Sequence, residues 1–169
     1  MSPLTARLRG GDLRSIGRSN EVAARVLKSP ELLDELFEGL FHKEAVVRAR
    51  AADALEKISR KQPDWLRPYR ARLVGRVALT DQQEVRWHVA QMLGRIVLTP
   101  SQRGNAVKVL HDYLENSDSQ IVKVCALQGL ADLAGRDPSL RPEVSRLVER
   151  ALEHGSPSLR ARAKKLRFP

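Results

Sequence analysis

The sequence predicts an all-α fold in which pairs of helices stack into a solenoid, because three observations agree. Nearly the same segment occurs four times at a fixed period. Within each copy, the apolar residues follow the 3.6-residue period of a helix with one buried stripe. Aromatic residues make up only 4% of the 169 residues, a composition that favours closely packed helices over strands. A fixed period near 37 residues with two helices per period is typical of helical repeat proteins.

The four copies align on an apolar residue followed by a basic one. These dipeptides lie 38, 37 and 37 residues apart, at Val47-Arg48, Val85-Arg86, Val122-Lys123 and Leu159-Arg160. In the first copy the predicted buried stripe is Val47, Ala51, Leu55 and Ile58, and the next two copies repeat its spacing. One helix cannot bury such a stripe alone, so we expect the copies to stack into a continuous core.

One further helix is expected in each period, and it precedes the repeated helix in the sequence. These helices are predicted at 30–41, 65–79, 101–115 and 139–152. Short polar runs such as TDQQ, NSDS and HGSPS separate the helices, as turns do. A helical segment at 11–29 is expected to cap the N-terminal end. We therefore predict a tail at 1–10 and one domain at 11–169.

On these residues the chain resembles the HEAT-repeat family, whose units consist of a first helix, a short turn, and an alanine-rich second helix that opens with Val-Arg. The resemblance implies a right-handed α-solenoid of about four helix pairs, with a curved face built from the second helices. One departure concerns the Asp that HEAT units carry three residues before the valine, in a ladder with the arginine. This chain has other residues at that position: Glu44, Gln82, Ser119 and Ser156.

The formal net charge of +10 is unevenly distributed. Segment 60–76 holds six basic residues against one acid, and segment 159–167 holds five against none. Such patches attract polyanions, and they also keep a protein soluble. No apolar run approaches the roughly 18 residues of a membrane span, so no membrane contact is predicted. The single cysteine, Cys125, excludes an intramolecular disulfide framework and fits a cytoplasmic location.

The repeated basic residue defines a column along the stack. Each cation either bonds to a neighbouring turn or, with the ladder acids mostly missing, is free to bind an outside anion. Trp87 follows one of these cations where other copies carry small residues, so it either fills a gap in the core or anchors a partner. The predicted macromolecule-binding surface comprises Arg48, Arg50, Arg86, Trp87, Lys123 and Arg160.

Signs of catalysis are weak. His88 and Cys125 share one phase in adjacent repeats, and such a pair would favour a thiolate, but no third orienting residue is visible. The four histidines lack metal-ligand spacing, and no carboxylate pair lies in an apolar run. HEAT-like DNA glycosylases combine a basic groove with tryptophans and a catalytic aspartate. Here Gln91 and Tyr69 stand one helical turn after the two tryptophans, so no catalytic residue can be assigned.

The sequence therefore predicts a non-catalytic binding module or scaffold, without cofactor or metal, that presents a basic surface to another macromolecule. The favoured partner is a protein with an acidic surface. Nucleic acid is the alternative, because binding to a phosphate backbone needs only a row of cations and is salt-sensitive. A DNA glycosylase is a more remote third hypothesis. A monomer is the favoured oligomeric state, and the alternative is that the C-terminal segment, LRARAKKLRFP, docks on a second copy of the chain instead of capping the stack.

Overall fold

The computed structural model describes residues 3–166, and this part of the chain contains helices and no strands. The α-helices are α1 (Pro3–Arg7), α2 (Ser19–Lys28), α3 (Leu33–Glu38), α4 (Ala45–Lys61), α5 (Arg70–Arg72), α6 (Gln83–Arg95), α7 (Pro100–Asn116), α8 (Gln120–Arg136), α9 (Arg141–His154) and α10 (Pro157–Ala163). Shorter helical segments are η1 (Pro30–Leu32), η2 (Gly39–Phe41), η3 (Pro63–Tyr69), η4 (Leu73–Val77) and η5 (Pro138–Leu140). The predicted all-α class is confirmed.

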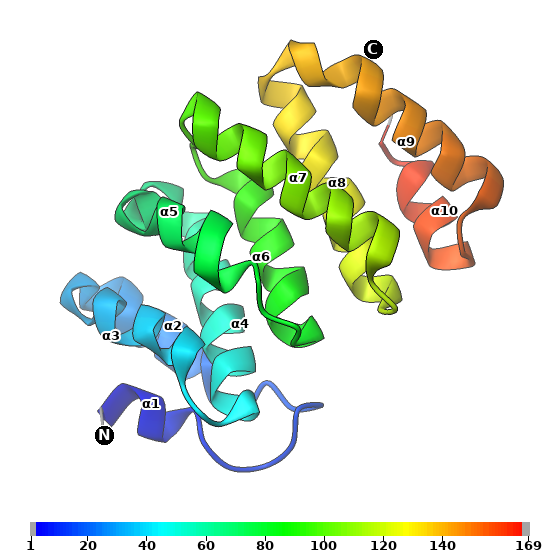
Figure 1. Cartoon of the computed structure of the whole chain (residues 1–169). Helices are drawn as coiled ribbons and strands as arrows, with labels where there is room; N and C mark the ends of the chain where they lie inside the picture. Colours follow the sequence, from blue (N-terminus) through cyan, green and yellow to red (C-terminus); the bar gives the residue numbers. More distant parts are fainter. Residues whose placement is uncertain (1–2, 167–169) are drawn as a thin grey trace.

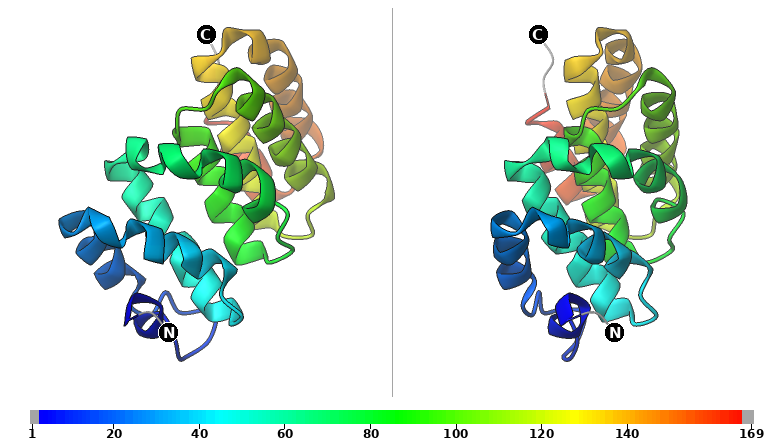
Figure 2. Two further views of the ribbon diagram at one scale, coloured as in Figure 1. Left: turned by 60° about the vertical axis from the view of Figure 1, so that its left-hand side comes forward. Right: turned by 90° about the vertical axis from the view of Figure 1, so that its left-hand side faces the viewer.

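The helices pair as the period predicts. The first members of the four pairs are η1-α3-η2, η3-α5-η4, α7 and η5-α9, and the second members are α4, α6, α8 and α10. Each second helix contacts the next one, so these helices lie side by side through the stack (Figure 1). The two ends of the chain lie at opposite ends of the stack in every view (Figure 2). The predicted HEAT-type solenoid of about four pairs is confirmed, with α2 packed on α4 at its N-terminal end.

The predicted buried stripes are confirmed in three copies. Their twelve members are at most 2% exposed: Val47, Ala51, Leu55, Ile58, Val85, Val89, Leu93, Ile96, Val122, Ala126, Leu130 and Leu133. The fourth copy buries Leu159 and Ala163. The stripes join into one core that runs through the stack, because each helix covers its neighbour's apolar side.

The helix predicted at 65–79 is not continuous. Pro68 lies inside η3, where it supplies no backbone N–H for a helical hydrogen bond, and the chain continues through α5 into the π-helical turn η4. Pro142 occupies the matching position two periods later but lies in the first turn of α9, where a missing N–H costs nothing. The same residue therefore has different effects because the helix starts at different points.

The segment predicted as a tail is packed against the rest of the protein from residue 4 onward. Leu4 and Leu8 are 1% and 0% exposed, and the Leu4 N–H donates to Glu35 Oε1 at 2.8 Å. Arg9 forms an ion pair with Glu44 at 2.5 Å. Leu4 and Leu8 lie one helical turn apart, and the short helix α1 packs onto α3. The domain boundary placed after residue 10 stays a prediction.

Glycines let α6 and α8 approach closely. A Cβ atom on Gly129 would lie 2.8 Å from the Ala90 carbonyl oxygen, and one on Gly94 would lie 2.9 Å from Gly129 Cα. Real Cβ atoms are essentially never found closer than 3.0 Å to such atoms. The backbones of α6 and α8 can therefore pack at this distance only while both positions lack side chains.

Candidate macromolecule-binding groove

A loop at residues 9–18 connects α1 to α2 and is fixed by one arginine of α4. Arg50 is 4% exposed and donates hydrogen bonds to the carbonyl oxygens of Leu8 at 2.8 Å, Gly10 at 2.6 Å, Asp12 at 3.2 Å and Ser15 at 3.1 Å. A fifth bond reaches the carbonyl of Arg9. Arg50 therefore holds the loop from inside and is not the exposed binding residue that the sequence predicted.

Two glycines allow the loop to wrap tightly around the guanidinium group. Gly11 and Gly17 have φ values of +72° and +52°, in the left-handed region that favours glycine. A Cβ atom on Gly17 would lie 2.6 Å from the central guanidinium carbon of Arg50. With the backbone turned inward, Leu13 and Ile16 are left 44% and 49% exposed.

These two side chains form one wall of a groove of about 490 Å³ on the face built from the second helices. Trp87 of α6 and Ile121 of α8 contribute further apolar surface, and Ile121 is 54% exposed. The full lining, called the groove from here on, comprises Leu13, Arg14, Ser15, Ile16, Ala49, Arg50, Asp53, Gln83, Glu84, Trp87, His88 and Ile121. Figure 1 shows the loop below α4, at the N-terminal end of the stack.

Trp87 meets both descriptions that the sequence left open. Its partly buried ring packs against the core and makes an edge contact with the His88 ring, at 5.7 Å between centroids. The same side chain lines the groove. The structure thus places Trp87 where it can fill the core and contact a ligand with its remaining surface.

Two polar residues of the groove, Asp53 and His88, lie close together. Asp53 accepts a hydrogen bond from Ser19 and forms an ion pair with Lys57, while His88 Nε2 lies 3.7 Å from Asp53 Oδ1. Burial lowers the pKa of His88 despite the nearby carboxylates, so its imidazole is neutral at pH 7. These groups hold α2, α4 and α6 together.

The first two members of the basic column are bound within the protein. Arg48 donates to Gln82 Oε1 and to the His42 carbonyl, each at 2.8 Å, so Gln82 takes the place of the ladder acid. Arg86 donates to the Thr80 carbonyl at 2.6 Å, and its guanidinium lies over the Tyr113 ring at 5.1 Å. The sequence left two alternatives for these arginines, a bond to a neighbouring turn or binding of an outside anion. The structure shows the bond to a neighbouring turn.

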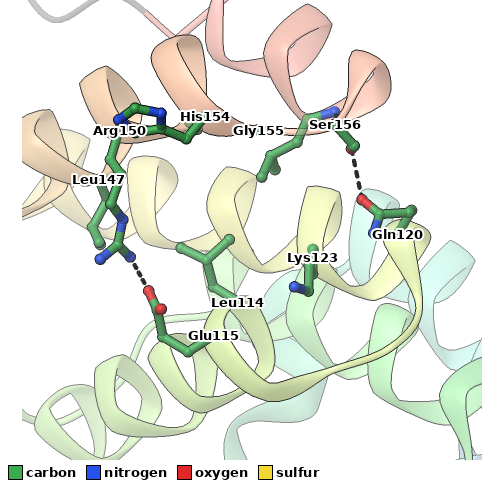
Figure 3. Close-up of a pocket in the computed structure, with 11 residues that line it drawn as sticks. Leu114, Glu115, Gln120, Lys123, Leu147, Arg150, His154, Gly155 and Ser156 are labelled. Atoms are coloured by element: carbon green, nitrogen blue, oxygen red, sulfur yellow. Dashed lines mark hydrogen bonds and ion pairs between the residues drawn. The ribbon is translucent and has the colours of Figure 1, made fainter.

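The last two members differ. Lys123 and Arg160 form no hydrogen bond or ion pair through their side chains within residues 3–166, and Arg160 is exposed. Lys123 lines a hollow of about 250 Å³ between α7, α8, α9 and α10. Figure 3 shows other lining residues paired with each other, Arg150 with Glu115 and Ser156 with Gln120. The structure therefore does not bring the six predicted residues together as one surface.

Cys125 and His88 do not form a reactive pair. Cys125 is buried, and its burial raises the pKa of the thiol to about 11. Relative to an ordinary pKa of 9.0, this leaves about 100-fold less thiolate at neutral pH. Its side chain therefore acts as a small apolar residue between α6 and α8.

We expect iodoacetamide at pH 8 to modify Cys125 about 100-fold more slowly than it modifies free cysteine, because both access and ionisation are reduced. Mass spectrometry over a time course measures the rate, and the same reaction in urea supplies the unfolded control. Equal rates for the folded chain and free cysteine would contradict this assignment.

Replacing Arg50 with Met should release the loop. Several carbonyl groups lose their only donor, but most can turn to water, so we expect a loss of about 2 kcal/mol of unfolding free energy. Hydrogen exchange should accelerate at 9–18 while α8 keeps its protection. Arg14→Met changes an exposed arginine of the same loop and should leave both measurements unchanged; unchanged exchange in the Arg50 variant would contradict the role of Arg50.

Within residues 3–166, no helix combines the length and apolarity needed to cross a membrane, and no cluster of His, Cys, Asp or Glu is arranged to hold a metal ion. The groove was not predicted from the sequence. The apolar residues of segment 9–18 could have indicated it. The role of Arg50 could not be predicted, because it depends on contacts with residues roughly 40 positions away in the sequence.

Stacked helix pairs of constant phase define an α-solenoid. A comparison with family models then matches a HEAT repeat domain over residues 11–166, and the chain belongs to the HEAT-repeat family. Neither the curated proteins nor the solved structures contain a match to the chain.

Proposed function

We propose that this chain is a non-catalytic binding module that holds a partner protein against its second helices. HEAT-repeat domains are helical scaffolds that commonly mediate protein interactions. The observation that carries the proposal is the groove, where exposed apolar side chains meet on a stacked, rigid face. An exposed apolar cluster of this kind is typical of a protein-binding site.

Nucleic acid is the less favoured partner because most cations of the basic patch at 60–76 are bound within the protein. Arg72 pairs with Glu38 and lies over the Phe37 ring, and Arg76 lies over the Phe41 ring. Arg60 pairs with Glu56, and Arg70 donates to the Val97 carbonyl. Four of the six basic residues in 60–76 thus have internal partners, which leaves fewer for a phosphate backbone.

Affinity capture from native lysate, with and without nuclease, tests the proposal. We expect a protein to be retained in both conditions. Titration of a labelled DNA duplex and a single strand at two salt concentrations, followed by fluorescence anisotropy, supplies the second measurement. Capture that disappears with nuclease, together with tight and salt-sensitive duplex binding, would replace the proposal with nucleic-acid binding.

A further inference from the structure

We infer that a basic hollow between the first two helix pairs binds a single phosphoryl group, either as free phosphate or on a phosphorylated side chain. The basic hollow has a volume of about 320 Å³ and is lined by residues within 40–48 and 76–85. Each of the two pairs contributes the end of its first helix, the turn and the start of its second helix. The basic hollow shares no lining residue with the groove, so the inference does not depend on the proposed function.

The lining of the basic hollow carries three positive charges and no carboxylate. The cations are Lys43, Arg48 and Arg76. Lys43 and Arg76 are exposed, and neither side chain forms an ion pair within residues 3–166. Arg76 lies over the Phe41 ring at 4.5 Å, a contact that orients the guanidinium group without neutralising it. Both charges can therefore act on an anion that arrives from solvent.

The acids close to the basic hollow in the sequence are engaged elsewhere. Glu44 Oε1 lies 2.5 Å from Arg9 Nη2, and Glu38 Oε1 lies 2.6 Å from Arg72 Nη1. The bond to Arg72 is the main reason why the pKa of Glu38 is lowered, and the charge of Arg76 contributes less. Two more acids line other cavities, Asp81 and Glu84. An arriving anion therefore meets no carboxylate in the lining itself.

Arg48 keeps its positive charge because the ladder acid is missing. Its Nε donates to Gln82 Oε1, and its Nη1 donates to the carbonyl oxygens of His42 and Lys43. All three acceptors are neutral, and the Nη2 atom forms no hydrogen bond within residues 3–166. An acid at position 82 would neutralise this arginine, whereas Gln82 leaves it a net charge and N–H groups for an outside oxyanion.

Two neutral side chains of the lining can donate further hydrogen bonds. His42 Nδ1 accepts a bond from the Glu44 N–H at 3.1 Å, so the neutral ring carries its proton on Nε2. Thr80 Oγ1 accepts from the Gln82 N–H at 3.2 Å, and its hydroxyl hydrogen remains to be donated. A phosphoryl group at pH 7 carries a charge of about −1.5 to −2 and three acceptor oxygens, which require several donors and more than one cation. The basic hollow supplies both.

The matching hollow one repeat later has the opposite charge. It is lined by Arg86, which stands 38 residues after Arg48, but also by Asp81 and Asp118. Asp81 occupies the position that Lys43 holds one repeat earlier, because these two residues are also 38 apart. The cations without acids are therefore gathered at one place, which suits one phosphoryl group better than the continuous backbone of a nucleic acid.

Two probes test the inference. Isothermal titration calorimetry measures the affinity for inorganic phosphate, and fluorescence anisotropy measures the affinity for a labelled Gly/Ser peptide with one phosphoserine. The unphosphorylated peptide is the blank. We expect Lys43→Gln/Arg76→Gln to weaken binding of the phosphorylated probe at least about tenfold. Gln82→Glu should weaken it about fivefold, because the new carboxylate pairs with Arg48.

The matched control is Lys108→Gln/Arg146→Gln, which removes two exposed cations outside the basic hollow and gives the same net charge as the double variant. Its affinity should stay within about twofold of the wild type, because distant surface charges are screened. Thermal unfolding checks that every variant folds.

The two probes also identify the source of the phosphoryl group. Tighter binding of the phosphoserine peptide than of free phosphate would assign the basic hollow to a phosphorylated side chain, and the reverse order would assign it to a free anion. Either result supports the inference. No binding of either probe, an unchanged affinity in Lys43→Gln/Arg76→Gln or in Gln82→Glu, or an equal loss in the control would overturn it.

Discussion

Gly129→Val should lower the free energy of unfolding by about 3 kcal/mol, because the new side chain has no space between α6 and α8. Its Cβ would lie 2.8 Å from the Ala90 carbonyl oxygen and 3.2 Å from Leu110 Cδ1. A backbone oxygen cannot move aside as a flexible side chain can, so the two helices must separate. For a chain of this size, the midpoint of thermal unfolding should fall by about 9 °C.

Gly135→Val is the matched control, because it makes the same substitution in the same helix. No atom lies within 4 Å of a Cβ at Gly135, and valine is no worse than glycine in a helix. We expect its stability to stay within about 0.5 kcal/mol of the wild type. Urea unfolding followed by circular dichroism compares the two variants. Similar free energies of unfolding for the two variants would show that the close approach of α6 and α8 does not restrict the side chain at position 129.

Removing both cationic partners of Glu56 should cost about 3 kcal/mol, because a buried carboxylate is left without compensation. Glu56 is 1% exposed, and its Oε1 lies 2.8 Å from Arg60 Nε and 3.0 Å from Arg95 Nη2. The double variant Arg60→Met/Arg95→Met keeps most of the apolar side-chain volume and removes the charges. It also removes the bond from Arg95 to Ser59 Oγ, which contributes part of the loss.

A third substitution separates the charge effect from the lost packing. Adding Glu56→Gln to the double variant removes the buried charge and should restore at least about 1 kcal/mol, although the amide has also lost its partners. Arg18→Met serves as the surface control, since it breaks an ion pair with Glu21 whose side chains are 61% and 59% exposed. This change should cost less than about 0.5 kcal/mol. No recovery with the glutamine would mean that the buried charge is not the cause.

The predicted architecture survived because it depended on a repeated pattern. The stripe of Val47, Ala51, Leu55 and Ile58 was visible at the same phase in three copies, so a single misleading residue could not change the result. The broken helix around Pro68 was missed because the effect of proline depends on its distance from the helix start. The helix at Pro3–Arg7 was missed because a short basic segment with two leucines carries little periodic signal.

The structure places the predicted binding residues in different environments. A shared phase correctly placed Arg48, Arg86 and Lys123 at equivalent points of successive helices, but it could not show which of them had acceptors nearby. Arg48 donates hydrogen bonds to the Gln82 side chain and to a turn carbonyl, and Arg86 donates one to the Thr80 carbonyl. Trp87, an aromatic residue at a position where the other copies carry small residues, lines the groove, and its role in binding stays a prediction.

The sequence alone determined the helical class, the period, the buried stripes and the family-like succession of pairs, since these follow from local periodicity and its repetition. Only the tertiary structure decided that Arg50 lies buried under a loop and that Gly129 controls a helix contact. It also brought Leu13 and Ile16 into the same groove as Ile121, which lies more than 100 residues further along the chain. The physical reason is that hydrogen-bond partners and close approaches between distant segments depend on how helices are stacked, which the spacing within any one helix does not specify.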